Sequence, residues 1–179
     1  RTGDRHSAYV REGDDITYKR MTLPRPDGHF AEQLNADLNT YRTSAYGQYE
    51  YRFPEPHYAA LRARFPKAEF LVFTTPVSAH LLKLLMEEDL LQTYLQWLRD
   101  LVNSWGSVWH FMNFNSVTMD DAYFADAQHI SPKVTRWIAD RLLEQARPDA
   151  PSDFGLLITR DNLEAQLEAI EANMLKQRP

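Results

Sequence analysis

The sequence predicts an α/β fold in which helices flank a buried parallel sheet. Two continuous apolar runs, 69–76 and 107–112, have the length and composition of strands that are buried on both faces. Between them lie two leucine-rich segments with helical periodicity, at about 78–88 and 89–104. This order of strand, helices and strand is typical of a βαβ crossover, which joins two parallel strands.

The chain before this crossover is predicted to be mainly irregular and helical. Residues 1–28 are polar and rich in turn-forming residues, and 16–21 is predicted as a short strand. Apolar residues at four- and three-residue steps predict an amphipathic helix from 29 to about 41. Tyrosines concentrate in 42–53, which is predicted to be a surface loop, and prolines bracket a short helix at 57–65.

The chain after the crossover is predicted to begin with a loop, 113–130, that leads into a helix at 131–146. Ser131 is a good N-cap for this helix, because its hydroxyl can accept a hydrogen bond from a free backbone N–H of the first turn. Residues 154–159 are predicted as a short strand or an extended segment, and 161–176 as a final amphipathic helix.

These segments are assigned to a single domain, or to the C-terminal part of one. It comprises an irregular and helical lead-in (1–53), an α/β segment (54–146) and a C-terminal helical extension (147–179). Two convincing strands are too few for four helices with apolar faces. Either the fold is helix-rich with a small sheet, or further strands come from elsewhere, and we favour the second. Because the first residue is Arg1, we expect that the chain was cut, processed or only partly given at its N-terminus.

The composition excludes several classes of protein. The chain has 179 residues with a formal net charge of -5, which argues against a nucleic-acid binder. No apolar run approaches the roughly 20 residues that span a bilayer, so no membrane span is predicted. The absence of cysteine excludes disulfides and a thiolate nucleophile, and fits the periplasm or the cytosol equally well. We expect no cofactor.

The pair Asp126 and His129 is the strongest candidate for chemistry. The two residues lie three apart, in a loop that leads directly into the helix capped by Ser131. A fixed histidine beside a carboxylate is the general-base half of a nucleophile–histidine–acid site. One alternative is that Asp126 caps a turn and His129 is an ordinary loop residue. Another is a metal site formed by Asp126, His129 and His110, although no metal-binding spacing supports it, so we expect no metal.

Residues 123–132, which read Tyr-Phe-Ala-Asp-Ala-Gln-His-Ile-Ser-Pro, resemble the last conserved block of the SGNH (GDSL-like) hydrolases. In that family an Asp-x-x-His pair precedes the final helix of a flavodoxin-like α/β domain. The preceding order is also similar, with a strand that ends in Thr-Thr-Pro at 74–76, a helix with a central Trp97 and a strand that carries Trp109. The resemblance covers roughly 66–146. It implies a three-layer flavodoxin-like parallel sheet flanked by helices, with the N-terminal part of the domain missing.

The resemblance also implies roles for the two residues. His129 would take a proton from a serine hydroxyl and return it to the leaving group, and Asp126 would orient the imidazole. The reaction would be acyl transfer or ester hydrolysis. Within the superfamily, the chain looks most like the membrane-anchored bacterial SGNH-like proteins that modify cell-surface polysaccharide or cell wall. The implied substrate is therefore an acylated small molecule or polysaccharide, and the implied location is the periplasm or cell envelope.

The chain departs from the family pattern at the nucleophile. Gly3-Asp4 is followed by Arg5 and Gly13-Asp14 by Asp15, so no Gly-Asp-Ser block is present, and no Gly-x-Asn-Asp block occurs. We therefore expect the serine to come from an N-terminal part of the same protein. The competing interpretation is a degenerate member that has lost catalysis and serves as an interaction module.

Three further residues lie where a strand runs into a helix. Ser78 is the one internal serine worth testing as a nucleophile, but it lacks flanking glycines and an N-cap role explains it. Thr74 and Thr75 stand at the C-terminal end of a predicted parallel strand, where open α/β sheets bind ligands. They are predicted to line a substrate pocket.

Overall fold

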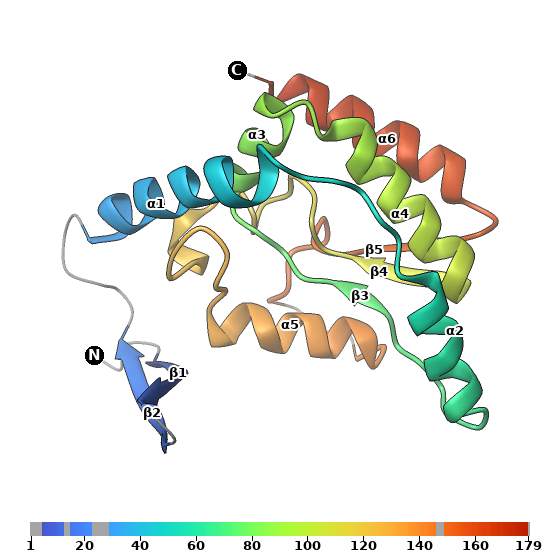
Figure 1. Ribbon diagram of the computed structural model, residues 1–179, viewed down its shortest axis with the longest axis horizontal. Helices are drawn as coiled ribbons and strands as arrows, with labels where there is room; N and C mark the ends of the chain where they lie inside the picture. The colour runs from blue at the N-terminus through green and yellow to red at the C-terminus, as the bar shows by residue number, and fades with distance from the viewer. Residues whose placement is uncertain (1–4, 13–14, 23–28, 146–148, 179) are drawn as a thin grey trace.

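Figure 1 shows the computed structural model of the chain, which describes residues 5–12, 15–22, 29–145 and 149–178. Among these residues the chain forms six α-helices and two sheets, one of two strands and one of three. The predicted α/β class is confirmed at this level. No helix in the described ranges is both long and apolar enough to cross a membrane.

The three-stranded sheet contains β3 (Phe73–Thr74), β4 (Ser107–His110) and β5 (Leu156–Thr159), in that order across the sheet. Strands β3 and β4 are parallel, with Phe73 opposite Trp109, so the predicted crossover is confirmed. Strand β5 pairs with β4 in the antiparallel direction, with Trp109 opposite Leu157. The described sheet is therefore mixed: the predicted parallel arrangement is confirmed for β3 and β4 and does not extend to β5.

Strand β3 is shorter and more exposed than the apolar run 69–76 predicted. Ladder pairing is confined to Phe73 and Thr74, although Val72 extends the contact by accepting a hydrogen bond from the backbone N–H of Trp109 at 2.9 Å. Leu71 and Phe73 expose 51% and 42% of their surface. The prediction that this strand is buried on both faces is wrong, because these two side chains, two residues apart and so on the same face, are largely exposed. In the described sheet β3 forms an edge.

Helices cover both faces of this sheet (Figure 1). The crossover contains α3 (Ala79–Glu87) and α4 (Leu91–Trp105), and α4 packs with α6 (Leu163–Lys176) on one face. Helix α5 (Pro132–Leu142) lies on the other face. The predicted helices at these positions are confirmed, and α5 ends at Leu142, four residues earlier than predicted.

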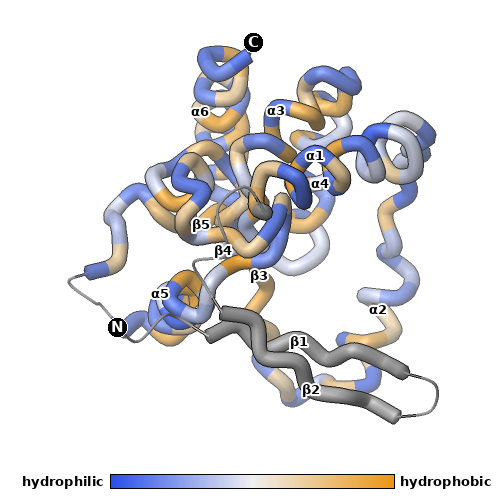
Figure 2. Tube along the Cα trace, turned by 90° about the vertical axis from the view of Figure 1, so that its left-hand side faces the viewer, coloured by the Kyte–Doolittle hydropathy of each residue, from blue (hydrophilic) through white to orange (hydrophobic). Residues whose placement is uncertain are grey.

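Side chains of β4 alternate between the two faces of the sheet and so contribute to two separate hydrophobic clusters. Val108 packs with the residues of α4 and α6, whereas Trp109 and, just beyond the strand, Phe111 pack with Trp137 of α5. Successive side chains of a strand point to opposite faces, so one strand serves two clusters. In Figure 2 hydrophobic residues accordingly gather in the central strands, and hydrophilic residues recur along the outer helices.

The N-terminal part contains more regular structure than the sequence predicted. Strands β1 (Arg5–Glu12) and β2 (Asp15–Thr22) form an antiparallel hairpin, so the strand expected at 16–21 is confirmed and a partner strand was missed. Helix α1 (His29–Thr40) is confirmed, but a π-helix, η1 (Tyr41–Tyr46), replaces the first part of the predicted loop. The short helix is α2 (Glu55–Arg64).

Candidate functional site

The candidate pair sits in a loop that closes on itself. Phe124 and Ile130 form an antiparallel bridge, and the N–H of Ala125 donates to the carbonyl of His129 at 2.7 Å. The N–H of Ser131 donates to the carbonyl of Tyr123 at 2.8 Å. These bonds tie the two ends of the loop together and attach it to the N-cap of α5, so its conformation is set by a packed helix.

The carboxylate of Asp126 organises this loop. One oxygen, Oδ1, accepts hydrogen bonds from the backbone N–H groups of Gln128 at 2.9 Å and His129 at 2.8 Å. The other, Oδ2, lies 2.6 Å from Nδ1 of His129. Burial by itself raises the pKa of Asp126, but the backbone donors and the imidazole outweigh it and lower that pKa below its ordinary value. The carboxylate is therefore ionised at neutral pH.

The hydrogen bond to Asp126 decides which nitrogen of His129 is free to react. An ionised carboxylate only accepts hydrogen bonds, so Nδ1 of His129 must carry a proton. In the neutral imidazole Nε2 is then the acceptor, and it has no hydrogen-bond partner among the residues that the structure describes. The side chain is 64% exposed. This arrangement suits a general base that takes a proton from a group arriving from outside.

The N-terminus of α3 holds the loop from one side. The N–H of Ser78 donates to the carbonyl of Ala127 at 3.0 Å, and the N–H of Ala79 donates to the carbonyl of Thr118 at 2.7 Å. Nε2 of His80 lies 3.1 Å from Oδ1 of Asp121. Since α3 follows β3 directly, these contacts bring the candidate pair to the C-terminal end of β3.

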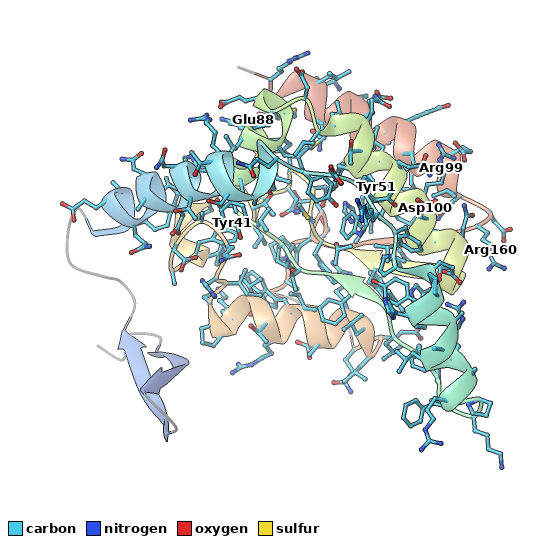
Figure 3. All side chains as sticks on the ribbon, in the orientation of Figure 1. Tyr41, Tyr51, Glu88, Arg99, Asp100 and Arg160 are labelled. Carbon is cyan, nitrogen blue, oxygen red and sulfur yellow. The ribbon has the colours of Figure 1, made fainter. Side chains whose placement is uncertain are left out.

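Helix α1 and the π-helix hold the loop from another side. Oδ2 of Asp37 accepts from the N–H of Ala127 at 3.2 Å, and the hydroxyl of Tyr41 donates to the side-chain oxygen of Gln128 (Figure 3). Burial, followed by the charges of Asp37 and Asp126, raises the pKa of Tyr41. Neither contact was predictable from the sequence, because nothing in the residues from 29 to 46 marks them as partners of a loop some 90 residues later.

The two threonines predicted to line a substrate pocket have different environments. Thr74 is buried, and its hydroxyl lies 3.0 Å from Nδ1 of His110 while accepting the N–H of Phe111 at 3.0 Å. The polar atom of Thr74 is therefore engaged inside the protein, and its place in a substrate pocket stays a prediction. Thr75 is exposed.

The buried ring of His110 does not join Asp126 and His129. Its Nε2 lies 2.7 Å from the hydroxyl of Tyr94, which donates to the carbonyl of Met112 at 2.5 Å. A tyrosine has one hydroxyl proton, so Nε2 of His110 donates to Tyr94 and Nδ1 accepts from Thr74. Both ring nitrogens of His110 are engaged in these hydrogen bonds. The alternative that His110, Asp126 and His129 form a metal site is therefore wrong. No group of three or more metal-ligating side chains occurs in the described ranges.

Ser78 occupies the N-cap position of α3 but is not placed as a nucleophile. The residue is fully buried, and its hydroxyl oxygen has no hydrogen-bond partner among the described residues, including the first turn that it was expected to cap. It is attached to the candidate loop through its backbone N–H alone. The cap expected at Ser131 is confirmed, with its hydroxyl accepting from the N–H of Val134 at 3.5 Å.

Comparison with known proteins gives this chain no relative: no family model matches it, and neither a curated protein nor a solved structure does.

Proposed function

We propose that this chain is the C-terminal part of an SGNH-like serine esterase or O-acyltransferase, to which it contributes Asp126 and His129. The observation that carries the proposal is the 2.6 Å contact between Oδ2 of Asp126 and Nδ1 of His129, which leaves Nε2 exposed and free. The fold proposed for the complete domain is the three-layer flavodoxin-like sheet, of which β3, β4 and the helices beside them would be the C-terminal portion.

In the proposed reaction each group has one task. Nε2 of His129 removes the proton from a serine hydroxyl as the oxygen attacks the acyl carbon, and then delivers that proton to the leaving group. Asp126 keeps Nδ1 protonated and stabilises the imidazolium that forms. The substrate class is an acylated small molecule or polysaccharide, with the periplasm or cell envelope as the proposed location.

The serine is proposed to come from an N-terminal part of the same protein, which would pair with β3. This proposal is supported by the outer edge of β3, which has no neighbouring strand among the described residues and near which Leu71 and Phe73 are exposed although the surrounding run is strongly apolar. Exposed apolar edge strands are a hazard that proteins normally cover. A strand beside β3 would end near the loop of Asp126 and His129, and so could deliver a serine at its C-terminal end.

A second candidate is an interaction module without catalysis, and the same edge of β3, unpaired among the described residues, favours it. In this case the edge of β3 would bind a strand of a partner, as in β-augmentation, and the loop would have only a structural role. The free Nε2 of His129 would then have no substrate to serve.

The test is hydrolysis of 4-nitrophenyl acetate by the protein that contains this chain at its natural full length. Replacing His129 with Gln should reduce kcat/KM on the order of 10³-fold or more while the melting temperature stays the same, since the ring is exposed. His57→Gln, on an exposed position of α2, is the matched control and should be as active as the parent. Equal activity of His129→Gln and the parent would refute the catalytic role. Full activity of residues 1–179 alone would refute the proposal that the serine comes from another part of the protein.

A further inference from the structure

A concave pocket of about 210 Å³ lies between α3, α4 and the segment that follows η1. Its walls include four aromatic rings, from Tyr46, Tyr49, Tyr94 and Trp97. The lining also includes the apolar side chains of Leu85, Leu90 and Met112. The pocket does not include the loop of Asp126 and His129.

The lining of this pocket carries no charged side chain. The remaining wall residue, Thr93, contributes a hydroxyl. Nearby charges are paired with one another, because Arg42 bonds Glu87 at 2.6 Å and Glu88 at 3.1 Å. Burial raises the pKa of Tyr46 to about 12, so its hydroxyl is neutral as well. A charged ligand would lose part of its hydration here without gaining an ionic partner from the lining, which disfavours its binding.

The pocket is preformed rather than an incidental gap. Contacts on both sides hold the segment that carries Tyr46 and Tyr49. Before it, Arg42 forms ion pairs with Glu87 and Glu88. After it, the hydroxyl of Tyr51 donates a 2.5 Å hydrogen bond to Asp100 on α4 (Figure 3). The ring of Tyr46 also packs on Tyr41, with 5.4 Å between ring centroids. Fixed walls reduce the conformational entropy that the protein loses when a ligand binds.

The floor of the pocket is equally rigid. The hydroxyl of Tyr94 is held by Nε2 of His110 and by the carbonyl of Met112, so the ring cannot turn to fill the space. Trp97 lies beside Tyr94, with 6.1 Å between centroids. Met112 adds a polarisable sulfur, which makes favourable contacts with aromatic rings. The pocket therefore presents aromatic and sulfur surfaces to whatever enters it.

From these observations we infer that the pocket is a binding site for a neutral, mainly hydrocarbon ligand or substituent of one-ring size. The size follows from comparison with an engineered apolar cavity of about 150 Å³ in another protein, which binds benzene. A pocket of about 210 Å³ has room for one ring with a small substituent. The lining also includes Tyr46, Tyr49 and Thr93, whose side chains carry hydroxyls that can hydrogen-bond a single polar group on that ring. This inference is independent of the proposed acyl-transfer function.

The inference is tested with fluorobenzene as the probe, followed by ¹⁹F NMR as the chain is titrated. We expect saturable binding with a dissociation constant on the order of 1 mM or below. The anion 4-fluorobenzoate should bind at least tenfold more weakly. Absence of saturable fluorobenzene binding, or equal affinity for 4-fluorobenzoate, would overturn the inference. Displacement of fluorobenzene by methyl glucoside at similar concentrations would overturn the hydrocarbon class in favour of a sugar.

Two substitutions on α4 locate the site. Thr93→Phe fills the pocket with a ring and should weaken fluorobenzene binding at least tenfold. Gln96→Phe adds the same ring at an exposed position of the same helix and should leave binding unchanged. If Thr93→Phe binds like the parent, the site is elsewhere and the inference fails. If Thr93→Phe does not fold, Tyr49→Ala replaces it, because Tyr49 is 49% exposed and its loss should weaken binding severalfold without disturbing the core. Unchanged binding in Tyr49→Ala would also count against the inference.

Discussion

The hydroxyl of Thr74 lies 3.0 Å from Nδ1 of His110, inside the protein and across the parallel pair β3 and β4. The chain of hydrogen bonds continues from Nε2 of His110 to Tyr94 on α4, and so links two strands with the helix that covers them. A buried polar network of this kind is stable only while each member keeps its partner. It therefore gives the fold a measurable dependence on pH.

We expect acid to destabilise the protein through His110. Burial lowers its pKa from 6.5 to about 3 in the folded state, so the unfolded chain binds the proton more readily. The contribution of neutral His110 to the free energy of unfolding is complete above about pH 6.5. As the pH falls from there towards 3, the free energy of unfolding decreases by about 1.4 kcal/mol per pH unit. Urea unfolding at pH 4, 5, 6 and 7 measures this slope.

The variant His110→Gln cannot titrate at this position, so its free energy of unfolding should fall less steeply between pH 6.5 and 4 than that of the parent. His57→Gln removes an exposed histidine from α2 and should keep the parent's slope. Identical slopes for His110→Gln and the parent would show that His110 is not the group responsible.

The two glycines with positive φ are expected to respond differently to a methyl group. Gly106, at φ +87°, ends α4, and a Cβ there would meet no atom within 4 Å. Gly155, at φ +93°, precedes β5, and a Cβ there would lie 2.5 Å from a ring carbon of Phe111. Gly106→Ala should cost roughly 1–3 kcal/mol for backbone strain alone. Gly155→Ala should cost roughly 1–3 kcal/mol more, because the buried ring of Phe111 must move. Denaturant unfolding of the two variants compares these costs, and an equal loss in both would contradict the close approach to Phe111.

The two helix-starting serines are expected to behave in opposite ways when truncated. Ser131→Ala removes the acceptor for the N–H of Val134 and should lower the free energy of unfolding by about 1 kcal/mol. Ser78→Ala removes a buried hydroxyl that has no described partner, so it should leave stability unchanged or raise it by up to roughly 1 kcal/mol. Thermal unfolding of both variants and of the parent measures these changes in stability. A loss in Ser78→Ala as large as that in Ser131→Ala would mean that the hydroxyl of Ser78 has a partner after all.

Local patterns accounted for much of the fold. The apolar spacing of the helices identified α1, α3, α4, α5 and α6, and the strand–helix–strand order identified the parallel pairing of β3 with β4. Within the candidate site, the three-residue spacing of Asp126 and His129 was enough to suggest their contact, because a tight loop of this length brings the two side chains together. The direction of β5 was not predictable, since a short apolar run pairs equally well in either direction.

What the sequence determined by itself is therefore local: the helices, the crossover, the cap at Ser131 and the close spacing of Asp126 and His129. Only the tertiary structure decided which polar groups face inward and which surfaces stay open. Thr74 and His110 are buried because β4 lies between two helical layers, while the apolar side chains of Leu71 and Phe73 stay exposed at the edge of the described sheet. The pocket at Trp97 joins residues from Tyr46 to Met112, and such a surface depends on how distant segments pack, which short-range periodicity does not specify.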